Sequence, residues 1–297
     1  LGTYCNQLIN RLSTADKKVI FESANAIWVD NQIVLNKPFV CLTEGYYCAA
    51  VASADMSDPA TARSINDWVS SKTHKMIEKI VDNTSDWRVA LVNAVYFKSP
   101  WKEDFDQMKG FEFTDINGRT SQVDAMRASF HGSYSEDSHF RMAELRYGSN
   151  GSFVMDVLMP KKDLKSDLPY LNAESWNALL KNVEGRQVHF RMPEFEVSYG
   201  SNMSDALREL GMGRAFSSSA QFGRMSDWPL CIDVVIQKAK IIVNHKGTEA
   251  AASTLVGMKD AACAPEDPVE FFVDRPFIYI LRESHRGEIL FIGNKLN

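Results

Sequence analysis

The sequence predicts an α+β protein. Three apolar runs have the length and composition of β-strands, and they occupy Val19–Val29, Arg88–Lys98 and Phe153–Met159. Helical periodicity is found at Pro59–Val81 and again in the residues up to Leu210. Because strands and helices do not alternate regularly, the pattern disfavours a doubly wound parallel sheet and favours the α+β class.

The first strand and the first helix both carry boundary signals. The Asp30-Asn31 pair is a turn signal that ends the strand Val19–Val29. Ser57 or Asp58 can cap the helix Pro59–Val81, and proline suits its first turn. The residues that share the apolar face of this helix are Ile65, Trp68, Val69, Met76, Ile77 and Ile80.

The next two strands are nearly continuous apolar runs, which is typical of strands covered on both faces. Asn93 interrupts the run Arg88–Lys98, and a buried amide must find hydrogen-bond partners. It is either a satisfied core amide or part of a region where a sheet opens. The run Phe153–Met159 is closed by Pro160.

The second half of the chain contains further strands and one more helix. Val188–Val197 alternates as a strand, and Ser201 or Asn202 can cap a helix that runs through Leu210 and ends at Gly211. Two later segments also have strand-like sequence, Cys231–Val243 and Gly287–Phe291.

A long connection of small, polar and proline-containing sequence runs from Gly247 to Glu270. Connections of this length are uncommon in compact domains unless they are functional. Thr248 can cap a short helix with Glu249 in its first turn. Read with period two, the segment instead has one small, uncharged face and one mixed face. The small face comprises Thr248, Ala250, Ala252, Thr254, Val256 and Met258; the mixed face comprises Glu249, Ala251, Ser253, Leu255, Gly257 and Lys259.

Composition excludes several classes of function. The 297 residues are 45% hydrophobic and 24% charged, which is ordinary for a soluble globular protein. A net charge of -5 argues against nucleic-acid binding, and no apolar run approaches the roughly 20 residues needed to cross a bilayer. We expect one domain over residues 1–297, because no linker or repeat is visible.

No pattern of catalytic or metal-binding residues is present in the sequence. There is no Gly-x-Ser-x-Gly elbow, phosphate-binding glycine loop or His-Glu-x-x-His pair. The five cysteines have no paired spacing and the six histidines are scattered, so we expect no disulfide framework, no metal and no cofactor. The sequence therefore predicts a protein that is not an enzyme.

Five motifs recur in an order that resembles one known family. Gly-Thr-Glu followed by small residues begins at Gly247, and the other four are Ile65–Val69, Asn93–Lys98 with Trp101, Leu207–Met212, and the pair Asp274–Ile280 and Gly287–Gly293. Together they resemble the serpins, the loop-inserting protease inhibitors, over nearly the whole chain. Serpins normally begin with several helices that have no counterpart before Leu1. We therefore expect that the numbered sequence lacks an N-terminal part of the native protein.

The resemblance implies a large central, mostly antiparallel β-sheet, smaller sheets, surrounding helices and an exposed reactive-centre loop. Serpin loop insertion is an established example of strand addition and of stored strain, so the mechanism comes with the resemblance. A protease cleaves the loop, which then enters the main sheet and traps the protease as an acyl-enzyme. The implied hinge of the loop comprises Gly247, Thr248, Glu249, Ala250, Ala251, Ala252, Ser253 and Thr254. The implied sheet-opening region comprises Asn93, Trp101 and Gln237.

Two positions depart from the family pattern near the hinge. Inhibitory relatives usually have Glu where this chain has His245, so an acidic anchor is expected to be missing. Many have His where this chain has Gln237, which cannot become charged. Neither change affects the small residues of the hinge. The inhibitory interpretation is therefore kept, with a non-inhibitory carrier or chaperone as the alternative.

Counting from the hinge as in the family places the reactive bond between Ala261 and Ala262, which favours an elastase-like serine protease with a small pocket. Asp260 is an alternative that would suit a caspase-like cysteine protease, Lys259 would suit a trypsin-like protease, and Met258 is a further alternative. We expect a monomer. The localisation stays open, with a secreted or extracytoplasmic location favoured.

Overall fold

A computed structural model describes residues 2–248 and 267–297, which form two compact units. The first unit comprises Leu1–Thr14, Ile20–Phe97 and Ser198–Lys240; the second comprises Ala15–Val19, Lys98–Val197 and Ile241–Asn297. Strands β3 (Val89–Pro100), β9 (Phe195–Asn202) and β10 (Val234–Asn244) each have residues in both units. The expectation of a single domain stays a prediction.

The first unit combines a sheet with helices. Its remaining strands are β1 (Ile20–Asp30) and β2 (Ala49–Ala54), and within this unit the strand order is β2-β1-β3-β10-β9. Strand β1 pairs parallel to β2, and β3 pairs parallel to β10. Its helical segments are α1 (Gly2–Thr14), α2 (Lys37–Tyr47), α3 (Pro59–Lys72), α6 (Ser204–Leu207), η2 (Arg208–Met212) and η3 (Gly213–Phe216).

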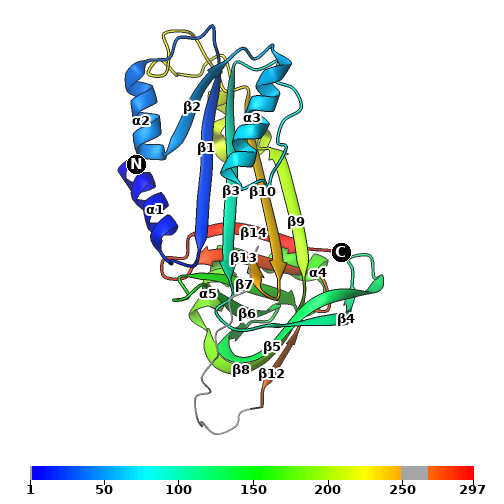
Figure 1. Ribbon diagram of the computed structural model, residues 1–297. Helices are drawn as coiled ribbons and strands as arrows, with labels where there is room; N and C mark the ends of the chain where they lie inside the picture. Colours follow the sequence, from blue (N-terminus) through cyan, green and yellow to red (C-terminus); the bar gives the residue numbers. More distant parts are fainter. Residues whose placement is uncertain (1, 249–266) are drawn as a thin grey trace. The chain divides into compact units, whose positions relative to one another are not determined.

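Helix α3 covers one face of this sheet and lies over β3 and β10 in Figure 1. Its buried side chains include Ile65 and Val69, which pack in one core with small residues of β1 and β3. The Asp58 carboxylate accepts from the Ala60 N–H at 2.8 Å, so Asp58 and not Ser57 caps the helix. Pro59 occupies the first turn as expected.

The predicted helix Pro59–Val81 was wrong at its end, because α3 stops at Lys72. His74 and Lys75 have positive φ angles of 50° and 66°, which are incompatible with a continuing helix. The chain then follows an irregular path, and Asn66 holds it. The Asn66 side chain accepts from the Ile80 and Val81 N–H groups and donates to the Val81 carbonyl.

The second unit is built on a larger sheet with strand order β12-β8-β5-β6-β7-β13-β14, with β4 paired to β5. These strands are β4 (Asp106–Thr114), β5 (Thr120–Glu136), β6 (Phe140–Tyr147), β7 (Phe153–Pro160), β8 (Glu184–Pro193), β12 (Val269–Phe272), β13 (Phe277–Glu283) and β14 (Ile289–Lys295). Every residue of β7 is buried, which confirms the prediction for Phe153–Met159. The unit also contains α4 (Leu164–Asp167), η1 (Leu168–Tyr170), α5 (Ala173–Lys181) and the short strand β11 (Gly247–Thr248).

Three other predicted elements have different bounds in the structure. The predicted strand Val188–Val197 is divided at Glu194 into β8 and β9. The helix predicted to run through Leu210 is regular only from Ser204 to Leu207, and Gly211 follows with a φ of 95°. The last strand begins at Ile289, later than the predicted Gly287, because Gly287 has a φ of 79° in the preceding turn. The α+β class itself is confirmed.

Candidate functional site

The candidate site is the point where the long connection leaves the sheet. In the first unit, β3 and β10 pair directly as parallel neighbours, from Ala90 opposite Val234 to Val95 opposite Ala239. In the second unit, the ends of the same two strands are instead paired to β11. Thr248 lies opposite Ser99 on one side and Val243 on the other, and both pairings are antiparallel. The start of the connection is therefore already a strand with both of its edges bonded.

Gly247 is required at this position for two reasons. Its φ of 136° lies in a region that side chains rarely adopt. A Cβ atom added here would also lie 2.2 Å from the Ser99 carbonyl oxygen and 2.6 Å from the Pro100 Cα. The close approach of β11 to β3 therefore depends on glycine.

Thr248 is the first side chain of the connection that is fully buried, with 0% of its surface exposed. A hydrogen bond of 2.6 Å joins its Oγ1 to the hydroxyl of Tyr147, which is also fully buried at the end of β6. Burial raises the pKa of the Tyr147 hydroxyl well above its usual range, and the hydrogen bond to Thr248 opposes this only in part. The two hydroxyls therefore form an uncharged hydrogen bond, which holds Thr248 in the strand between β3 and β10.

Trp101 contacts both Tyr147 and the end of β10. Its ring stacks on Tyr147 with centroids 4.2 Å apart and an interplanar angle of 17°. Its indole N–H donates to the Asn244 carbonyl at 2.8 Å, so it also bonds the end of β10. Trp101 was assigned to the sheet-opening region in the sequence, and the structure places it against the residues that hold Thr248.

Asn93 and Gln237 lie in the first unit and are direct neighbours across the pairing of β3 with β10. The Asn93 side chain donates to the Asn25 side-chain oxygen at 2.7 Å, so this half-buried amide does find a partner. The structure brings these two predicted residues together, while Trp101 belongs to the second unit.

His245 contacts Glu194, a residue that sequence reasoning missed. The Glu194 Oε1 lies 2.6 Å from His245 Nδ1 and accepts from the His245 backbone N–H at 2.9 Å. Position 245 has no acidic side chain, as expected, but Glu194, which separates β8 from β9, places a carboxylate next to it. No local sequence pattern singled out Glu194 or Tyr147, because both contacts join residues that are far apart in the sequence.

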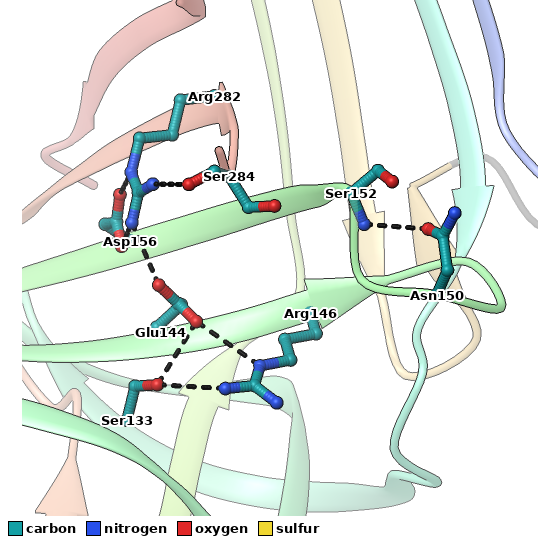
Figure 2. Close-up of polar contacts among 8 residues, drawn as sticks. All are labelled: Ser133, Glu144, Arg146, Asn150, Ser152, Asp156, Arg282 and Ser284. Atoms are coloured by element: carbon teal, nitrogen blue, oxygen red, sulfur yellow. Dashed lines mark hydrogen bonds and ion pairs between the residues drawn. The ribbon is translucent and has the colours of Figure 1, made fainter. Parts of the chain in front are cut away.

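A charged cluster fixes β6, the strand that carries Tyr147 (Figure 2). Arg282 on β13 donates to both carboxylate oxygens of Asp156 on β7, at 2.6 and 3.1 Å, and to Glu144 on β6 at 2.9 Å. Glu144 also accepts from Arg146 at 3.3 Å. Burial raises the pKa of Asp156 to about 6, and Arg282 opposes that rise. Because each charge has a partner of opposite sign, the cluster holds β6, β7 and β13 in register.

The remaining predicted site residues lie outside the described residues. They are the rest of the hinge, Glu249, Ala250, Ala251, Ala252, Ser253 and Thr254, and the proposed reactive positions Met258, Lys259, Asp260, Ala261 and Ala262.

Two further properties concern the described residues alone. Among residues 2–248 and 267–297, no group of three His, Cys, Asp or Glu side chains is arranged to hold a metal ion. No helix in that same part of the chain has the length and apolar character needed to span a membrane.

Comparison with known proteins decides the family. The model of the family described as Serpin (serine protease inhibitor) matches residues 3–297. The chain belongs to the serpin family. Members of this family are not enzymes, so the predicted family and the expectation that the chain is not an enzyme are confirmed. The family supports a protease-inhibitor function in general.

Several serpins resemble this chain closely. Serpin-Z1B from Triticum aestivum is 32% identical, and the match covers 98% of this chain and 77% of that protein. The native-state structure of the thermophilic serpin Tengpin is 28% identical with a TM-score of 0.85, covering 95% of this chain and 74% of that one. Thyroxine-binding globulin in complex with thyroxine has a TM-score of 0.90 at 22% identity, covers 100% of this chain and 80% of that one, and shows the serpin fold alone.

Proposed function

We propose that this serpin is a suicide pseudo-substrate whose reactive-centre loop inserts between β3 and β10 after cleavage. A protease would attack the loop and form an acyl-enzyme through its own nucleophile. The freed end would then extend β11 along the sheet and carry the protease with it. About 13 residues at roughly 3.3 Å each correspond to a displacement on the order of 40 Å. A displacement of even about 1 Å at the catalytic residues can slow deacylation roughly 100-fold.

The observation that supports this proposal most directly is the pairing of Gly247 and Thr248. Both edges of β11 are bonded, while β3 and β10 beyond it are paired to each other in parallel. Extending β11 would replace one parallel pairing with two antiparallel ones, and antiparallel pairs are the more stable per residue. The uninserted form would thus be metastable and would persist because of a kinetic barrier.

The sequence after Thr248 supports the same proposal. Continued with period two, the positions on the buried side of Thr248 are Ala250, Ala252 and Thr254, all of which are small and uncharged. Burying an unpaired charged side chain there would cost far more than the roughly 2–7 kcal/mol of an unbonded neutral polar group. This composition fits an inserting loop better than that of a carrier.

We propose an elastase-like serine protease as the target, with Ala261 and Ala262 forming the reactive bond. A trypsin-like target cleaving at Lys259 and a caspase-like target cleaving at Asp260 are the alternatives, and we propose a monomeric inhibitor. A non-inhibitory carrier is the competing function. The likeness to thyroxine-binding globulin is one of fold and does not decide between the two functions.

One experiment distinguishes these functions. The protein is mixed with pancreatic elastase and, separately, with trypsin, and the products are separated on a denaturing gel. An inhibitor gives a covalent band that combines both masses, whereas a carrier gives only cleaved chain. Mass spectrometry of the cleaved loop then identifies the reactive bond. Cleavage by both proteases without any covalent band would refute the inhibitory mechanism.

A further inference from the structure

An outward-facing row of side chains crosses four strands of the sheet in the second unit. Pairing places Asp106 on β4 opposite Arg127 on β5, Arg127 opposite Arg191 on β8, and Arg191 opposite Phe272 on β12. We call these four residues the Arg191 row. They line a groove of about 300 Å³ together with Ser129, His189 and Glu270 of the next row.

The two arginines of the row are direct neighbours, and like charges directly opposite each other on one face are destabilising. Arg127 has a partner, because its Nε lies 3.8 Å from the Asp106 carboxylate. Arg191 lies over the Phe272 ring, with its guanidinium carbon 4.2 Å from the ring centroid. Among the described residues, the Arg191 side chain has neither an ion pair nor a hydrogen bond. The Asp106 and Glu270 carboxylates also line the groove, but neither is bonded to Arg191, so the Arg191 donors face the groove without a bonded partner.

This arrangement is suited to binding a carboxylate. A guanidinium that lies over an aromatic ring still has N–H groups available for a bidentate contact with two carboxylate oxygens. A bound carboxylate would also reduce the repulsion between Arg127 and Arg191. Arginine and aromatic residues are the types that contribute most binding energy in protein interfaces.

The position of the row favours the target protease as the partner. Phe272 follows Ala261 by 11 residues, so the two are separated by at most about 40 Å of extended chain. A protease domain of roughly 230 residues has a radius of gyration of about 17 Å, and so a diameter of about 45 Å. A protease that holds the reactive bond therefore has surface within reach of the row.

We propose that the Arg191 row is an exosite that binds an acidic side chain on the surface of the target protease, with Arg191 as its main contact. This inference rests on the proposed function in taking the protease as partner. It goes beyond the reactive bond, because the row would accelerate encounter with one protease relative to another with the same pocket. Charged contacts at the edge of an interface act mainly on the association rate.

The test measures how fast a protease attacks the loop. Whichever of elastase and trypsin attacks the wild-type protein faster is used, and covalent complex and cleaved chain are counted together as loop attack. Arg191→Glu is expected to lower the second-order rate constant at least 10-fold in low salt, and less near 0.5 M salt. Arg191→Lys keeps the positive charge but removes the planar guanidinium, and we expect it to have an intermediate rate constant. Lys181→Glu, which makes the same charge change at the exposed end of α5, is the matched control.

Each outcome separates the exosite from the inhibitory mechanism. If the loop is cleaved without a covalent band but Arg191→Glu still slows the attack, the inhibitory function fails and the exosite stands. Equal rates for Arg191→Glu and Lys181→Glu overturn the exosite. The exosite is also overturned if Arg191→Glu slows the attack only when heparin is added and at the same time binds heparin more weakly. That result would assign the row to a sulfated polysaccharide.

Discussion

The hydrogen bond between Tyr147 and Thr248 gives the sharpest test of hinge docking. Tyr147→Phe removes the phenol that lies 2.6 Å from the Thr248 hydroxyl, and both residues are fully buried. The loss of the bond costs about 0.5–1.5 kcal/mol, and an unsatisfied buried hydroxyl costs about 1–3 kcal/mol. We expect a net weakening of hinge docking by about 1–2 kcal/mol, which is a factor of roughly 5–30.

This weakening is expected to change the fate of the cleaved loop. If insertion begins from the docked Gly247–Thr248 pair, undocking slows insertion while hydrolysis of the acyl-enzyme continues at its own rate. The share of cleaved, uncomplexed protein should therefore rise several-fold relative to the covalent band. The assay is a denaturing gel after reaction with elastase, or with trypsin if trypsin forms the complex.

A matched control and a double mutant isolate the bond. Tyr134→Phe is the control. It removes a hydroxyl of the same unit that donates to Glu136 over 2.9 Å and does not contact Thr248. Thr248→Val together with Tyr147→Phe replaces both partners by apolar groups, so the double variant should lose less than the sum of the single variants. If Tyr147→Phe and Tyr134→Phe change the ratio of products equally, or if the double variant is additive, the reasoning about hinge docking is refuted.

Three other changes have defined outcomes. Gly247→Ala should lower the free energy of unfolding, measured in urea, by about 1–3 kcal/mol, because the added Cβ would collide with the Ser99 carbonyl. It should also raise the share of cleaved, uncomplexed protein. Gly213→Ala is the control and should change neither quantity, since Gly213 lies in open space. Ala252→Arg should leave cleavage intact but abolish the covalent complex, and undiminished complex formation would contradict it. Burial by itself would raise the pKa of Asp16. Hydrogen bonds to its carboxylate from the backbone N–H groups of residues 18, 149 and 150 and from the Ser149 hydroxyl outweigh burial, so the Asp16 pKa lies below its usual range. The Asp16 carboxylate therefore stabilises the fold fully above the unfolded-state pKa of about 3.9, and this stabilisation is lost as the pH falls through the lower folded-state pKa. In urea titrations, Asp16→Asn should lose less free energy of unfolding on acidification than the wild type.

The strands that position the hinge were predictable because their patterns are local. The run Arg88–Lys98 is apolar on both faces, and it forms most of β3. The helix at Pro59 was predicted too long for a physical reason. Ile77 and Val81 continue the helical spacing of apolar residues and are buried in the same core, but an irregular segment brings them there. Periodicity reports burial, and it does not distinguish a helix from an irregular segment that buries the same residues.

The hinge contacts were only partly predictable. Gly247 and Thr248 were identified from the family pattern, and that pattern also included Trp101. Tyr147 and Glu194 were missed, because each meets its partner across a long sequence separation, 101 residues for Tyr147 and Thr248 and 51 for Glu194 and His245. One sequence contains no signal for such pairs. They are fixed only once the strands have been assembled.

The bonded edges of Gly247 and Thr248 also restrict how this loop can change in length. Since the first two residues are already aligned with their neighbours, every later residue of an added strand has its side fixed by simple alternation. Inserting one residue directly after Thr248 would move the Glu249 carboxylate to the inward side, whereas inserting two would leave the pattern intact. Insertions or deletions between Thr248 and the proposed reactive positions, which begin at Met258, should therefore be tolerated when they change the length by an even number of residues.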